Sequence, residues 1–262
     1  ILNGKKEVLK LVVANIAGSI LSLLVTGFLA VQYHLYGALI ALSIYQSIAF
    51  FVTLFLCYKA NWFKISYLFG RIEPKIAKNF AAFALMALVS AICVPLSQMV
   101  IRSYLSQEFG LNYAGYWEAM IRLSGAYLML VTTTLGVYYL PRLSELTHLD
   151  EIKKEVYLGY KFIFPLAVVG GFCIYVLRDW IITLLFSQAF MPMRDLFLWQ
   201  MIGDSLKIGS WILAYLMLSK AMTKLFVTTE ILFALSSMGL TYVCSKLFGF
   251  EGVSIAHLVN YA

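Results

Sequence analysis

Long apolar runs limit what this chain can fold into. Repeated stretches of roughly 20 apolar residues have the length that a helix needs to cross about 30 Å of hydrocarbon. Charged residues make up only 13% of the chain, whereas soluble domains carry about 25%. No water inside a bilayer satisfies backbone groups, so such runs fold as helices, and the alternation typical of a membrane barrel is absent. We therefore predict an all-α integral membrane protein.

The apolar runs predict seven full spans and the start of an eighth. The seven cover residues 9–31, 36–58, 78–101, 112–140, 161–177, 197–218 and 222–245. The eighth begins at Gly252. Residues 180–190 are too few to span, and we expect them to extend the fifth span or to lie in the interface. The chain begins at Ile1 and stops within an apolar run, so we expect an internal fragment of a longer protein.

The distribution of Lys and Arg predicts the orientation of the spans. The N-terminal segment and alternate connections hold fourteen of them, namely Lys5, Lys6, Lys10, Lys59, Lys64, Arg71, Lys75, Lys78, Arg142, Lys153, Lys154, Lys161, Lys220 and Lys224. The opposite side holds four, namely Arg102, Arg178, Arg194 and Lys246. The positive-inside rule places the first group in the cytoplasm. Because the net charge of +7 lies in these connections, it does not indicate a nucleic-acid partner.

An internal repeat is visible at an offset of 215 residues. The segments YGALIALS and EGVSIAHL align at this offset, and the glycine of each, Gly37 and Gly252, opens a new span after an outside loop. Six spans lie within the offset, and an even number preserves orientation. The repeat suggests two homologous six-helix halves in parallel orientation.

Two long segments resemble a known family. They are GYWEAMIRLSGAYLMLVTTTLGVYYLPRLSEL at 115–146 and LRDWIITLLFSQAFMPMRDLFLWQMIGDSLKIGSWILAYLMLSKA at 177–221. Both resemble the second half of the bacterial O-antigen and enterobacterial common antigen flippases. These belong to the polysaccharide-exporter branch of the multidrug/oligosaccharidyl-lipid/polysaccharide exporter superfamily.

The resemblance implies a fold of twelve helices in two lobes. This chain would hold helices five to eleven and the start of helix twelve. Residues 1–58 would then be the last two helices of the N-terminal lobe, and 59–77 a cytoplasmic inter-lobe linker. Residues 78–262 would form the C-terminal lobe, truncated in its last helix.

The resemblance also implies a function. The expected cargo is an undecaprenyl-pyrophosphate-linked oligosaccharide, moved by alternating access from the cytoplasmic to the periplasmic leaflet of the bacterial inner membrane. No covalent chemistry, and so no enzyme activity or cofactor, is expected. Further expected partners are membrane lipid, a coupling proton or cation, and the polymerase and chain-length proteins of the same pathway. The glycan itself stays open.

Five charged residues lie within predicted spans, where a charge costs at least about 2.5–3.5 kcal/mol and marks a functional site. They are Glu118, Arg122, Asp204, Lys207 and Glu230. Arg122 and Lys207 are candidates for binding pyrophosphate, because cationic side chains bind phosphate oxygens. The three acids are candidates for proton or cation coupling. Alternatively, Glu118 with Arg122 and Asp204 with Lys207 neutralise each other within one helix.

Residues near the span ends carry weaker signals. The pairs Arg178–Asp179 and Arg194–Asp195 favour structural caps and interfacial salt bridges at the periplasmic edge. Trp117 is a candidate for stacking on a sugar, although most such aromatics belong to the interfacial belt. The histidines are scattered, so a metal site is not expected; they are His34, His148 and His257.

Charge alone does not select an anionic cargo, since the spans hold three acids against two bases. A cation-coupled multidrug exporter of the same superfamily therefore remains an alternative. A membrane glycan polymerase or ligase would need a large periplasmic loop with catalytic Arg or His, and the predicted periplasmic loops are short. A scaffold without transport activity would not need charges at several depths.

The charge bias gives a testable topology. A reporter fused after Lys154 should report the cytoplasm, and one fused at Ser106 should report the periplasm, because Lys and Arg favour the cytoplasmic side. Alkaline phosphatase and fluorescent-protein fusions measure this. A periplasmic signal at Lys154 would overturn the assignment of spans.

Overall fold

The computed structural model describes residues 8–58 and 73–262. The chain divides into two compact units, 1–73 and 74–262. The ordered elements in the described part are all helical, and no strand occurs there. The prediction of an all-α protein is therefore confirmed. Most of the predicted linker, residues 59–72, lies outside the described residues.

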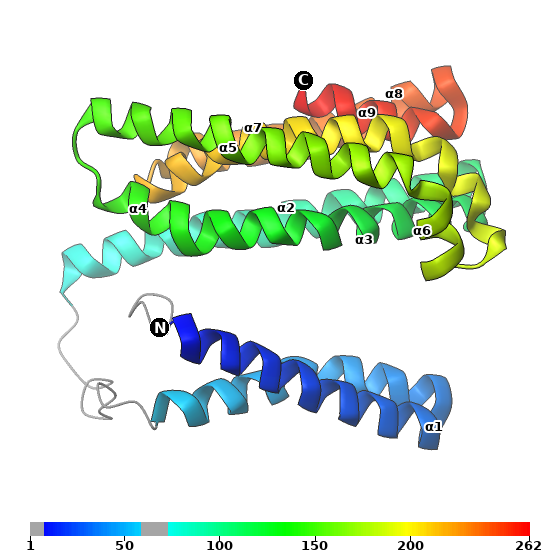
Figure 1. The fold of residues 1–262 in the computed structure, drawn as a ribbon, viewed down its shortest axis with the longest axis horizontal. Coiled ribbons are helices and arrows are strands. Elements are labelled where there is room, and N and C mark those ends of the chain that lie inside the picture. The colour runs from blue at the N-terminus through cyan, green and yellow to red at the C-terminus, as the bar shows by residue number, and fades with distance from the viewer. Residues whose placement is uncertain (1–7, 59–72) are drawn as a thin grey trace. The chain divides into compact units, whose positions relative to one another are not determined.

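The first unit contains one long helical run, α1 (Val8–Tyr58). The run is broken at His34, where φ is 50° and ψ is −132°, so that α1 comprises two helices that fold back on each other (Figure 1). A Cβ atom on Gly37 would lie 1.9 Å from the carbonyl oxygen of Leu29. Glycine at this position therefore lets the two helices approach closely at the turn.

The second unit is a bundle of long helices with shorter segments at the connections. Its elements are α2 (Pro74–Glu108), α3 (Leu111–Thr134), the π-helix η2 (Leu135–Tyr139), α4 (Leu140–Glu145), α5 (Leu149–Val176), α6 (Arg178–Leu185), the 3-10 helix η3 (Gln188–Leu196), α7 (Phe197–Ser219), α8 (Thr223–Phe248), the 3-10 helix η4 (Gly249–Glu251) and α9 (Gly252–Tyr261). The long helices run side by side, and α6 and η3 lie at one end of the bundle (Figure 1).

Six described segments are long and apolar enough to cross a membrane. They are Val12–His34, Ile76–Glu108, Leu111–Glu145, Leu149–Val176, Gln188–Ser219 and Thr223–Tyr261. The predicted second span, 36–58, is helical as part of α1 but is not one of the six. The predicted seventh span and the start of the eighth fall in one segment. Residues 180–190 form α6 and the beginning of η3 instead of extending α5.

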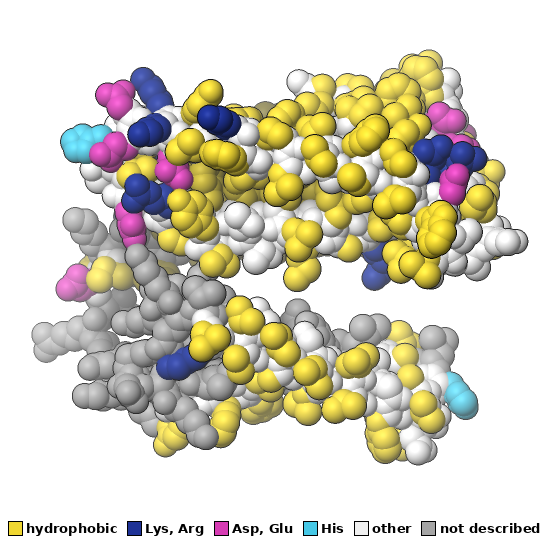
Figure 2. Space-filling view, viewed as in Figure 1, with side chains coloured by type: hydrophobic (Ala, Val, Ile, Leu, Met, Phe, Trp, Pro, Cys, Tyr) yellow, Lys and Arg dark blue, Asp and Glu magenta, His cyan; other side chains and the backbone are white. Residues whose placement is uncertain are grey.

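The surface of the second unit suits a hydrocarbon environment. On its visible face, hydrophobic side chains cover the helices, and charged side chains gather mainly at the two ends of the bundle (Figure 2). Large apolar side chains are widely exposed, among them Leu130 at 77%, Leu184 at 76% and Phe162 at 65%. A soluble monomer rarely exposes contiguous apolar surface on this scale. The chain is therefore a multi-pass membrane protein.

Helix α7 lies at the centre of the bundle. It packs against α5 and α9, while α9 packs on α8, α8 on α2, and α2 on α3. Its buried residues recur every three or four positions, as in Phe197, Met201, Asp204, Ile208 and Ile212. This spacing gives one buried stripe along the helix. The stripe carries a carboxylate into the interior together with the apolar side chains.

The turn between α8 and α9 repeats the geometry of the turn in α1. Gly249 has φ 65° and ψ −145°. A Cβ atom on Gly252 would lie 2.2 Å from the carbonyl oxygen of Cys244. Each of these three positions lies 215 residues after its counterpart in α1, which is the offset of the sequence repeat. The repeat therefore has a counterpart in backbone conformation.

A close contact between α7 and α9 gives a testable expectation. A Cβ atom on Gly203 would lie 2.6 Å from Cδ2 of His257 and 3.1 Å from Cα of Leu258. Gly203→Ala should therefore push α9 away from α7 and destabilise the protein by about 1–3 kcal/mol. The thermal unfolding temperature of the purified protein in micelles measures the change.

The matched control is Gly239→Ala on α8. A Cβ atom there would meet nothing within 4 Å. This substitution should leave stability unchanged or raise it by up to about 1 kcal/mol, because alanine favours a helix interior over glycine. Equal unfolding temperatures for the two variants would contradict the close packing of α7 on α9.

Candidate functional site

A cavity of about 730 Å³ lies inside the second unit, between α2, α3, α7, α8 and α9. The charged and ionisable side chains of its lining are Asp204, Lys207, Glu230 and His257, apart from cysteine and tyrosine. Trp117 also reaches the lining. Four of the residues singled out from the sequence thus meet at one cavity, namely Trp117, Asp204, Lys207 and Glu230.

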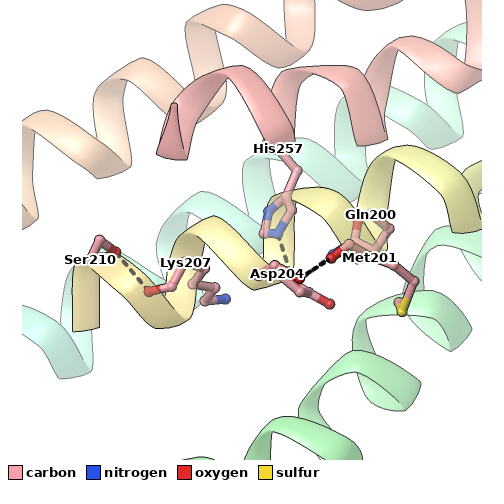
Figure 3. Close-up of polar contacts among 7 residues, drawn as sticks. Gln200, Met201, Asp204, Lys207, Ser210 and His257 are labelled. Carbon is pink, nitrogen blue, oxygen red and sulfur yellow. Dashed lines mark hydrogen bonds and ion pairs between the residues drawn. The ribbon is translucent and has the colours of Figure 1, made fainter. Parts of the chain in front are cut away.

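Asp204 is fully buried, with a side-chain exposure of 0%. Its Oδ1 atom lies 2.9 Å from Nε2 of His257 on α9, and accepts a hydrogen bond of 3.3 Å from Nε2 of Gln200 on α7 (Figure 3). A buried carboxylate is tolerated only with such partners. Asp204 therefore joins α7 to α9 at the wall of the cavity.

Four buried oxygen atoms around Asp204 have no hydrogen-bond partner among the described residues. Ser124 and Tyr127 on α3 face the carboxylate. The unpartnered atoms are Oδ2 of Asp204, Oε1 of Gln200, the hydroxyl oxygen of Ser124 and that of Tyr127. Unpartnered buried polar atoms are uncommon and call for a water, an ion or a function. The hydroxyl groups of Ser124 and Tyr127 are thus placed to serve as further hydrogen-bond donors to Asp204.

Lys207 lies one turn from Asp204 on the same helix (Figure 3). Its Nζ atom is 5.2 Å from the ring centroid of Trp211 and 5.5 Å from that of Tyr261. Aromatic faces attract a cation at this range. No ion pair joins Lys207 to Asp204 or to another acid in the described part of the chain. Asp204 and Lys207 thus form no direct salt bridge within α7, although their charges are near enough to interact.

Glu230 and Trp117 differ in their access to the cavity. Glu230 on α8 is half-buried and forms no ion pair with a described residue. Trp117 on α3 is 4% exposed and belongs to a hydrophobic cluster with Ile101, Leu105 and Val253. Most of the indole of Trp117 therefore packs in the core, and little of it is exposed at the lining.

Glu118 and Arg122 lie outside the cavity lining. Nε of Arg122 donates a hydrogen bond of 2.9 Å to Oε1 of Glu118, as the spacing within one helix predicts. Arg102 on α2 forms a second ion pair with Glu118. The side chain of Arg122 is 76% exposed. In this structure the three residues form an ion-pair cluster between α2 and α3.

The residues that the sequence predicts at the periplasmic edge form one expected pair and one unexpected pair. Nε of Arg178 lies 3.8 Å from Oδ1 of Asp179, as expected. Nε of Arg194, however, lies 3.0 Å from the same Asp179 and joins η3 to α6. No pair between Arg194 and Asp195 occurs among the described residues, where Arg194 is paired with Asp179 instead. Arg178, Arg194 and Asp195 line a smaller hollow of about 330 Å³.

His257 is the residue of the cavity that sequence reasoning missed. The sequence shows it only as one of three scattered histidines, yet it is the ionisable partner of Asp204. A signal was available, because an ionisable side chain within an apolar run is a candidate site whether or not it is charged.

The arrangement has two chemical capabilities. The ammonium group of Lys207, held between two aromatic rings, can bind an anionic group such as a phosphate. The pair of Asp204 and His257 can gain and lose a proton without leaving an unpartnered charge in the interior. Both lie within one cavity.

Comparison with known proteins identifies the family. The curated relatives include the lipid III flippases of Escherichia coli (strain K12) and Shigella flexneri, each 34% identical over 82% of this chain. The chain spans about half the length of these relatives, 54%. No family model and no solved structure matches the chain. The identity over most of a chain of membrane-spanning helices shows that this chain belongs to the lipid III flippase family.

Proposed function

We propose that the protein moves an undecaprenyl-pyrophosphate-linked oligosaccharide from the cytoplasmic to the periplasmic leaflet of the bacterial inner membrane. Alternating access of the cavity is the proposed mechanism, without covalent chemistry. The observation that carries the proposal is the cavity itself, in which Lys207 has aromatic neighbours but no acidic partner among the described residues. A cation in that state can bind a phosphate group of the cargo without first breaking an ion pair.

The proposed architecture follows the family. Residues 1–58 would end an N-terminal lobe, residues 59–77 would link the lobes, and residues 78–262 would form a C-terminal lobe that carries the cavity. Within the cavity, Lys207 would bind pyrophosphate, and Asp204 and Glu230 would couple transport to a proton or cation. Trp117 would contact a sugar. Polymerase and chain-length proteins of the same pathway are proposed partners.

A cation-coupled drug exporter is the second candidate. Asp204 and Glu230 outnumber Lys207 in the lining, and an acidic cavity suits a cationic compound. With His257 protonated, the lining holds two positive charges, on Lys207 and His257, and two negative charges, on Asp204 and Glu230. This balance does not distinguish an anionic cargo from a cationic one. The relationship to the lipid III flippases favours the first.

Complementation tests the function. The natural full-length gene should restore surface common antigen in a strain that lacks its lipid III flippase, because the cargo of the relatives is the proposed cargo. Immunoblots of surface glycan measure this, and a strain that lacks its O-antigen flippase tests the related cargo. Failure in both strains, together with increased resistance to cationic drugs in a pump-deficient strain, would favour the drug exporter.

Substitutions at Asp204 and Lys207 test the site. Lys207→Met should lower flipping about tenfold or more, since a hydrogen bond to a charged group contributes about 1.5–3 kcal/mol. Asp204→Asn should lower it as well, and the double variant should not recover, because the two side chains form no ion pair with each other. Complementation and protein level in the membrane are measured together.

The matched control is Lys153→Met. Lys153 is 78% exposed on α5, away from the cavity, and its one ion pair within the described residues is a contact of 4.0 Å with the exposed Asp150. This variant should flip at the normal rate. Recovery of flipping in the Asp204→Asn, Lys207→Met double variant would show that the two residues serve only to neutralise each other.

A further inference from the structure

We propose that His257 and Asp204 form a proton-binding site linked to cargo binding at Lys207, so that the anionic cargo and a proton bind to the cavity together. The proposal rests on the proposed function for the identity of the cargo. The proton site itself rests on the geometry of α7 and α9. It also assigns a role to His257, which the sequence patterns did not single out.

The first observation is the pairing across two helices. Nε2 of His257 lies 2.9 Å from Oδ1 of Asp204, and the carboxylate is fully buried whereas the imidazole is 16% exposed (Figure 3). His257 also lines the cavity. The imidazole is thus the member of the pair that a proton from the cavity can reach, and Asp204 positions it.

The second observation is the space made for the imidazole. Gly203 precedes Asp204 on α7, and a Cβ atom there would lie 2.6 Å from Cδ2 of His257. Only the absence of a side chain at this position lets the ring lie against α7. On α9, the ring of Tyr261 lies 5.1 Å from that of His257. The ring is therefore held in one place by its neighbours.

The titratable groups around His257 come from several helices. Helix α7 contributes Asp204 and Lys207, and α9 contributes Tyr261. Glu230 on α8 lines the same cavity, and Tyr127 on α3 faces Asp204. Helix α2 contributes no charged residue to the lining, its one titratable group there being a cysteine.

The charges of the lining give the sign of the linkage. With both carboxylates ionised, Asp204, Glu230 and Lys207 leave one net negative charge, which repels a pyrophosphate. A proton on His257 cancels that charge. Imidazole is the side chain whose ordinary pKa, about 6.5, lies nearest to physiological pH. Cargo binding should therefore take up a proton, and the affinity for cargo should rise as pH falls.

Calorimetric titration of the natural full-length protein in micelles tests the linkage. The probe is a short prenyl chain joined through pyrophosphate to one sugar, a diester whose own charge is constant around neutral pH. Titrations in buffers of different ionisation enthalpy give the number of protons taken up. The affinity should rise by up to about tenfold per pH unit for one linked proton.

Two variants and one control sharpen the test. His257→Gln should bind the probe with an affinity that no longer depends on pH and without proton uptake. Asp204→Asn should shift the pH range over which binding takes up a proton. His148→Gln should behave as the wild type, because His148 is exposed at the N-terminus of α5, outside the cavity. Retained proton uptake in a folded His257→Gln protein would overturn the proposal.

The wild-type measurements decide the matter even where a variant does not fold. Probe binding with no proton uptake would overturn the proposal. If the affinity for the probe then depended on the sodium concentration, the oxygen atoms around Asp204 would bind a cation instead of a proton. If the probe does not bind at any pH, the proposed function has failed. Nuclear magnetic resonance of labelled histidines still tests the proton site in that case.

In that experiment one imidazole signal should be absent from His257→Gln and should shift its titration midpoint in Asp204→Asn. Titration between about pH 5 and 8 is expected for a histidine that exchanges its proton with the cavity. A His257 signal that does not change over this range would overturn the proton site independently of the cargo.

Discussion

The burial of one carboxylate organises the second unit of the structure. Removing an ionised carboxylate from water costs several kcal/mol unless hydrogen bonds and opposite charges compensate. Asp204 obtains its partners from two helices, Gln200 on α7 and His257 on α9. This requires α9 to lie directly against α7, which Gly203 permits. The cavity lies beside this contact, so the same interaction that joins α7 to α9 also presents ionisable groups to whatever enters.

Most of the fold could be predicted from the sequence because each membrane helix satisfies its own backbone. The all-α class follows from the length and spacing of the apolar runs and does not require the contacts between helices to be known. The break between the predicted seventh and eighth spans also lies where the sequence places it, because Gly252 opens the second of them. In α8 and α9 the chain turns within η4, three residues long, and the apolar run continues through it.

The candidate site could be predicted only as far as local spacing reaches. The pair of Glu118 and Arg122 is one helical turn apart, and it forms as expected. The partner of Asp204, in contrast, lies 53 residues further along the chain. That contact depends on the packing of α9 on α7, which no periodicity encodes. The same limit applies to Arg194, whose partner Asp179 lies on another helix.

The two turns that share one backbone geometry are unequal in energy. At the first, the left-handed conformation falls on His34, a residue with a Cβ atom, and at the second it falls on Gly249. Such a conformation costs a residue other than glycine about 1–3 kcal/mol. The first hairpin thus holds strain that the second has relieved, although both make the same close approach. Two turns of a repeated structure can therefore keep the same backbone geometry while differing in conformational strain.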